Sequence, residues 1–157
     1  MVSMLVGLHA VVAEIGLFAF IWVFVELLNP TEVRIKRAKI ASIIGVSFLV
    51  LSWFVGGAYY VGDYGTDVKP VIKSGDAAWT HGIAMEVKEH VFLFLPILAI
   101  VTSLLIFRYD NEIIRKEGEK IAIDLLAGLI FLMGFAMAGL GIMISMGFRY
   151  TLELGII

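Results

Sequence analysis

The stretch that decides the fold is Leu8 to Leu28, LHAVVAEIGLFAFIWVFVELL, where Glu14 and Glu26 are the only charged side chains. A helix needs roughly 20 mainly apolar residues to cross a bilayer, and this stretch supplies them. Three more helices of that kind are predicted downstream, over about residues 40–61, 77–107 and 121–148. The sequence therefore predicts an all-α, integral membrane four-helix bundle.

The composition indicates a single transmembrane domain over residues 1–157. Hydrophobic residues make up 61% of the chain, charged residues only 17%, and the mean hydropathy is +0.98. Soluble domains carry about 25% charged residues, so this composition argues against a soluble fold. The connections between the predicted helices are too short to fold by themselves. We therefore expect a multi-pass protein whose main partner is the lipid bilayer, with no nucleic-acid partner.

The distribution of basic residues predicts the orientation. Eight of the twelve Lys and Arg residues lie in the first and third connections. These eight are Arg34, Lys36, Arg37, Lys39, Arg108, Arg115, Lys116 and Lys120. Short cytoplasmic loops accumulate such residues. We therefore expect both connections in the cytoplasm and both termini outside, in a prokaryotic plasma membrane.

The two halves of the chain suggest a duplicated helix hairpin. When the second half is aligned on the first so that His9 falls on His90, Arg34 falls on Arg115 without a gap. A shorter echo competes with this register, because HAVVAE from His9 matches HGIAME from His81. The sequence therefore favours a two-hairpin pseudo-repeat without fixing its register.

Ionisable residues gather in one half of the predicted bundle. All three histidines, together with Glu14, Glu86 and Glu89, lie in the halves of the first and third helices that we place near the outer face. Charged residues inside a span cost about 2.5–3.5 kcal/mol on insertion scales, so each is a functional candidate. The chain has no cysteine, which excludes thiolate chemistry and iron–sulfur clusters.

The first interpretation of this cluster is a b-type haem bound by His9 and His90. Two histidines at matched depth on different helices are what an intramembrane haem requires. Glycines on the second and fourth helices leave room for the macrocycle. Lys88 lies near the opposite edge of its helix, where it either reaches a haem propionate or extends to the surface. The chain would then be a cytochrome b-like electron-transport protein that exchanges electrons with a quinone or a redox partner protein.

The second interpretation is a non-haem site for iron, manganese or zinc. Its candidate ligands are Glu14, Glu86, Glu89, His90 and His81. Carboxylate and imidazole groups are the donors that these metals use. On an ideal helix Glu86, Glu89 and His90 share one face and can converge.

A third interpretation needs no cofactor. Histidine and glutamate at helix ends can be solvated or bonded to each other, and small residues serve close helix packing. The chain would then be an accessory subunit of a homo-oligomer or of a larger membrane complex. Whether it is an enzyme is open at this point, because Glu14 and Glu86 could also serve a proton-coupled reaction or carrier.

Two segments resemble an uncharacterised family of bacterial four-helix membrane proteins. They are LHAVVAE, from Leu8 to Glu14, and the glycine-rich last helix, from Gly139 to Tyr150. In that family a His-Pro-x-x-x-His motif opens the first helix. Here His9 matches the first histidine, whereas Ala10 and Glu14 stand at the other two positions. The resemblance implies a four-helix membrane architecture and a membrane redox role.

Overall fold

The computed structural model describes residues 3–155, most of which are helical. Four continuous helical segments are long and apolar enough to cross a membrane: Met4–Leu28, Glu32–Ser74, Thr80–Ile114 and Glu117–Glu153. The predicted all-α architecture with four helices of spanning length is therefore confirmed.

The four segments form two helix hairpins. The first hairpin contains α1 (Met4–Leu28), α2 (Glu32–Tyr59), the π-helix η1 (Tyr60–Val68) and α3 (Lys69–Ser74). The second contains the π-helix η2 (Thr80–Met85), α4 (Glu86–Phe92), α5 (Phe94–Tyr109), the 3₁₀ turn η3 (Asp110–Ile114) and α6 (Glu117–Glu153). Local capping marks the start of α2, where the Thr31 hydroxyl accepts a hydrogen bond from the Arg34 amide at 3.3 Å.

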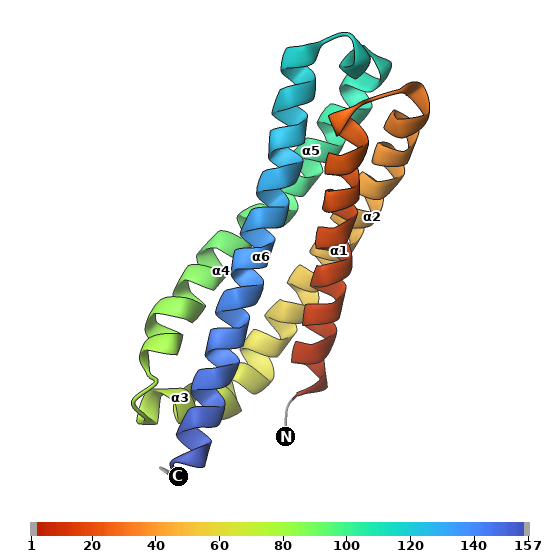
Figure 1. The fold of residues 1–157 in the computed structure, drawn as a ribbon. Helices are drawn as coiled ribbons and strands as arrows, with labels where there is room; N and C mark the ends of the chain where they lie inside the picture. Colours follow the sequence, from red (N-terminus) through yellow and green to blue (C-terminus); the bar gives the residue numbers. More distant parts are fainter. Residues whose placement is uncertain (1–2, 156–157) are drawn as a thin grey trace.

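The bundle has two chemically different ends. Figure 1 shows both termini and α3 at one end, which we call the terminal end, and the α1–α2 and α5–α6 connections at the other, the hairpin end. The two basic connections meet there, because Lys39 Nζ lies 2.6 Å from Asp110 Oδ1. The connections that we expected to share one side of a membrane therefore do lie at one end of the molecule.

Several predicted boundaries were too short. The second segment stays helical as far as Ser74, although the glycines after residue 61 predicted a loop. The chain continues there as a π-helix, and Pro70 occupies the first turn of α3, where a missing N–H is tolerated. The second segment also begins earlier, at Glu32, and α6 extends beyond its apolar run at both ends. Hydropathy marks only the apolar part of a helix and misses its polar ends.

Pro96 divides the third segment. The helix is interrupted at Leu93, between α4 and α5. Proline has no N–H to donate to the carbonyl of residue 92, and its ring crowds that carbonyl. Figure 1 shows that α4 leaves the direction of α5 and runs towards the terminal end beside α6. This change of direction opens space between α4 and the first hairpin.

The hydrophobic core consists of two separate clusters, one towards each end of the bundle. Its main cluster lies towards the hairpin end, where Phe20, Val23 and Ile106 are fully buried. A smaller cluster around Tyr64 and Ile144 lies at the terminal end. Large apolar side chains elsewhere point outward, as expected for helices that face lipid. Between the two clusters lie the cavities described below.

A charged network stabilises the hairpin end. The Glu26 carboxylate is buried, and it accepts hydrogen bonds from Arg34 Nε at 2.9 Å and from Trp22 Nε1 at 3.0 Å. The Arg34 guanidinium also donates to the carbonyls of Val25 and Asn29, at 3.2 and 3.0 Å. These carbonyls end α1 and have no partner within the helix. Arg34 thus joins the end of α1 to the start of α2.

We expect Arg34→Met to lower the free energy of unfolding by about 1–3 kcal/mol, because the Glu26 carboxylate would lose its strongest donor. Thermal unfolding in detergent, followed by circular dichroism, measures the change. The matched control is Lys36→Met, which removes an exposed cation two residues away. Equal unfolding midpoints for the two variants would show that the network contributes nothing.

Candidate functional site

A cavity of about 280 Å³ lies between the first hairpin and α4, in the half of the bundle nearer the terminal end. Its size is close to the lower end of the range for small-molecule sites, roughly 300–1,000 Å³. The lining is mostly aromatic and apolar, with a few polar groups. The lining residues are His9, Trp53, Gly56, Gly57, Tyr59, Tyr60, Met85, Lys88, Glu89, Phe92 and Leu93.

His9 is held in one orientation on the wall of this cavity. Its side chain is buried, and Nδ1 lies 2.9 Å from the Ser52 carbonyl oxygen and 3.0 Å from the Ser52 hydroxyl. A carbonyl can only accept, so Nδ1 carries the hydrogen, and Nε2 of the neutral ring has a free lone pair. No hydrogen bond to Nε2 is present among residues 3–155. Metal-binding and proton-accepting histidines are commonly fixed in this way.

Close packing fixes the same ring from two sides. A Cβ atom on Gly56 would lie 2.7 Å from His9 Nδ1, so only glycine fits beneath the imidazole. Phe92, at the end of α4, meets the ring edge-on with centroids 5.6 Å apart. The small residue on α2 that the sequence suggested would make room for a ligand therefore makes room for His9.

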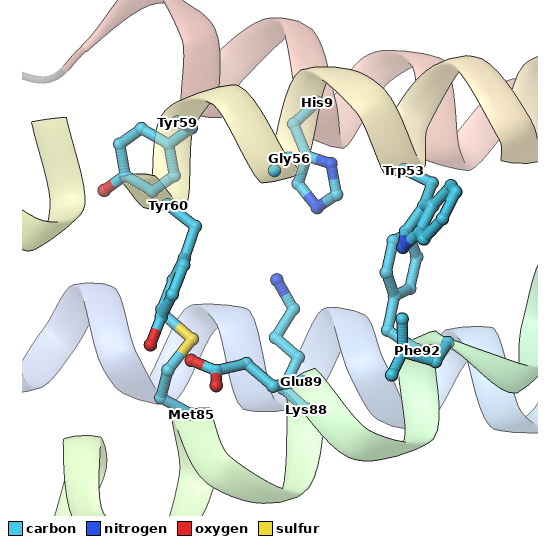
Figure 2. A pocket seen from close by; sticks show the side chains of 11 residues that line it. His9, Trp53, Gly56, Tyr59, Tyr60, Met85, Lys88, Glu89 and Phe92 are labelled. Atoms are coloured by element: carbon cyan, nitrogen blue, oxygen red, sulfur yellow. The ribbon is translucent and has the colours of Figure 1, made fainter. Parts of the chain in front are cut away.

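Lys88 turns inward and does not extend to the surface, which was one of the two positions expected for it. Figure 2 shows its ammonium group pointing across the cavity towards the His9 ring. The side chain is half-buried and forms no ion pair with any residue of the described chain. Its position follows from the helix face, because Met85, Lys88, Glu89 and Phe92 recur at the spacing of one helical stripe, and all four line the cavity.

Glu89 supplies a second polar group on that stripe. One carboxylate oxygen, Oε1, is buried and has no hydrogen-bond partner among residues 3–155. Figure 2 shows the Tyr60 hydroxyl facing this carboxylate from the start of η1. A buried oxygen without a donor is costly, so Oε1 is an acceptor that a ligand in this cavity could use.

A tyrosine–histidine pair lies next to the cavity at the terminal end. The Tyr64 hydroxyl is 2.9 Å from His81 Nδ1, and both side chains are buried. The Tyr64 ring stacks on Tyr60 with centroids 5.4 Å apart. These residues lie on or beside the π-helices η1 and η2, a type of helix that is frequent at functional sites. His81 is therefore engaged with Tyr64 instead of with the other predicted metal ligands.

The structure separates the remaining predicted residues. His90 and Glu86 are exposed on the opposite face of α4, and His90 Nδ1 lies 2.6 Å from the Glu86 carbonyl. Only His9 of the predicted haem pair lines the cavity. Glu14 is exposed and belongs to a neighbouring cavity. Across residues 3–155, no three His, Asp or Glu side chains are grouped so that they could hold one metal ion.

Most of the aromatic and apolar lining, Tyr60 and Trp53 included, was not singled out from the sequence as part of a site. Lys88 was expected either to reach a haem propionate or to extend to the surface. The sequence did contain a pattern that indicates an inward-facing Lys88. Met85, Lys88, Glu89 and Phe92 recur at i, i+3, i+4 and i+7, the spacing of one buried helix face. For Tyr60 and Trp53 the sequence offered no such signal, because aromatic residues are common at membrane interfaces.

Comparisons with family models, with curated proteins and with solved structures found no match to this chain. The fold and the cavity together define a helical protein of membrane-spanning dimensions with a partly buried polar site in its terminal half.

Proposed function

We propose that this chain is an integral membrane protein of a prokaryotic plasma membrane that binds the head group of a lipid-soluble quinol or quinone. The observation that carries the proposal is that His9 Nε2, the Lys88 ammonium and Glu89 Oε1 line one aromatic cavity without partners among residues 3–155. The positive-inside rule puts the terminal end, and with it the site, towards the outer face.

The three polar groups suit a quinol in particular. A quinol hydroxyl can accept a hydrogen bond from Lys88 while its own O–H donates a hydrogen bond to His9 Nε2. The second hydroxyl, across the ring, can donate to the Glu89 oxygen that lacks a partner. A quinone has only hydrogen-bond acceptors. It can therefore accept a hydrogen bond from Lys88, but it has no hydrogen to donate to neutral His9 or to Glu89. We therefore expect the reduced form to bind more tightly than the oxidised form.

The walls of the cavity match a flat, apolar ring. Trp53, Tyr60 and Phe92 provide aromatic surfaces, and Met85 provides a polarisable one. Lys88 also favours an oxygen-bearing ligand over a metal cation, because a cation would be repelled at this position. These features support a ring with oxygens at both ends more strongly than they support an inorganic ion.

Trp53 provides the readout for a direct test, because quinones quench indole fluorescence on contact. We expect a short-tailed ubiquinone, titrated into the purified protein, to quench part of the emission saturably, and the quinol to compete for the same sites. Trp53→Phe should remove the saturable part, whereas Trp79→Phe, outside this cavity, should keep it. Quenching that never saturates, or that survives in Trp53→Phe, would contradict binding in this cavity.

A second candidate is haem b bound through His9. The supporting observation is the His9 tautomer, in which Nδ1 is tied to Ser52 and Nε2 is free to coordinate iron. His90 would not be the other ligand, because it lies on the exposed face of α4. The oxidised and reduced visible spectra of the purified protein test this candidate. A Soret band in the wild type that is lost in His9→Ala would support haem binding. A wild-type protein that is colourless after expression with added haem precursor would contradict it.

A further inference from the structure

A second cavity lies on the other side of Lys88. It has a volume of about 250 Å³, and His9, Lys88 and Phe92 line both cavities. The Lys88 side chain lies along α6, where a Cβ on Gly141 would be 3.6 Å from Nζ. Lys88 thus lies on the border of the two cavities, with its ammonium group between the His9 ring and α6.

The second cavity reaches the outer surface of the bundle between α1 and α6. Figure 1 shows α6 leaning away from α1 towards the terminal end. Exposed residues of both helices form the rim, among them Ala10 on α1 and Ala138 and Ile142 on α6. Towards the centre the walls are apolar, with Leu17, Leu49, Leu95, Gly134 and Met137.

We infer that this second cavity is a lateral channel for the isoprenoid tail of the quinol, an inference that rests on the proposed head-group site. Small residues on the two facing helices, among them Ala10 and Ala13 on α1 and Gly134, Ala138 and Gly141 on α6, line this slot. The slot borders the head-group cavity at His9, Lys88 and Phe92, and its rim lies on the outer surface of the bundle. A ligand with a polar ring and a long apolar tail therefore has a place for each part.

The channel acts by admitting the tail and adds little affinity of its own. Lipid is as apolar as the channel walls, so moving a tail between them gains almost no hydrophobic free energy. Glu14 and Ser145 are exposed at the rim and leave the apolar walls to carry the tail. A blocked channel should therefore reject tailed ligands by steric exclusion and leave the tail-free head group unaffected.

The test compares Ala138→Phe with Gly139→Phe. Both variants add the same ring to α6, but residue 138 lines the channel, whereas nothing lies within 4 Å of a Cβ on Gly139. Trp53 quenching is titrated with ubiquinone carrying two isoprene units and with the tail-free ubiquinone head group. In Ala138→Phe we expect at least tenfold weaker binding of the tailed ligand and unchanged binding of the head group. Gly139→Phe should resemble the wild type for both.

The outcomes separate the two proposals. If the tail-free head group does not bind the wild type, the head-group site itself is wrong. If the head group binds but Ala138→Phe treats both ligands like the wild type, or weakens both equally, the tail channel is overturned and the head-group site stands. Circular dichroism of each variant confirms that the helices are intact.

Discussion

Replacing Lys88 by methionine will weaken quinol binding roughly 10- to 100-fold while the helical fold is kept. A hydrogen bond from a charged donor contributes about 1.5–3 kcal/mol, which corresponds to that range. Methionine retains most of the length and volume of the lysine stem, so the cavity should keep its shape. Trp53 quenching, with the quinol as competitor, measures the loss.

The same substitution should raise thermal stability. Lys88 forms no ion pair within residues 3–155, and an unpaired cation in a membrane span is unfavourable. Lys73→Met is the matched control, because it removes an exposed cation from α3, outside the cavity. Unchanged quinol affinity in Lys88→Met would show that Lys88 does not bind the quinol, which would contradict the proposed head-group site. A lower melting temperature would show that Lys88 is structural.

Replacing Gly134 by leucine will give the largest loss of stability that we expect. A Cβ at this position would lie 2.1 Å from Leu17 Cδ2, so the Leu17 side chain must move or the α1–α6 contact must open. Overpacking of this kind typically costs about 1–3 kcal/mol, and a leucine adds more bulk than a Cβ alone. We expect a clearly lower unfolding midpoint in detergent and a larger aggregated fraction on size-exclusion chromatography.

A control and a rescue make this prediction specific. Gly139→Leu places the same side chain on the exposed face of α6 and should be neutral or slightly stabilising, because leucine favours helix more than glycine does. Combining Gly134→Leu with Leu17→Ala should restore much of the lost stability, because the volume then moves from one helix to the other. A Gly134→Leu protein as stable as the wild type would mean that α1 and α6 do not pack as described.

The sequence predicted the fold well because hydropathy is a strong signal in long helices. The run from Leu8 to Leu28 lies entirely within α1, and the two basic connections do meet at one end of the bundle. The terminal end was predicted poorly, because glycine and proline normally indicate a loop. The chain instead continues through η1 and α3 to Ser74, and this extension brings Tyr60 and Tyr64 next to α4.

The candidate site was predicted in part. His9 and Glu89 were singled out as candidate ligands of two different sites, and in the structure both line one cavity. Helical phase explains why the sequence did not show that Lys88 faces the cavity and His90 does not. Our ideal-helix projection related the residues of α4 to one another but could not say which face meets the first hairpin. The π-helix η2 and the break at Leu93 set that face, and neither follows from periodicity alone.

The pseudo-repeat stays a prediction, although the two registers now differ in physical terms. The longer one pairs buried His9 with exposed His90. The shorter one pairs His9 with His81, and both are buried with Nδ1 bonded to another segment. The shorter register therefore matches the two environments better.

Photoaffinity labelling with an azido-ubiquinol identifies the residues that a bound quinol contacts. The purified protein is illuminated with the probe, digested and analysed by mass spectrometry, with and without excess unlabelled quinol. We expect competed labelling on peptides that contain His9, Trp53 or Lys88, which line the head-group cavity from α1, α2 and α4. Labelling that is not competed and falls on outward-facing residues such as Leu132 and Phe135 would contradict it.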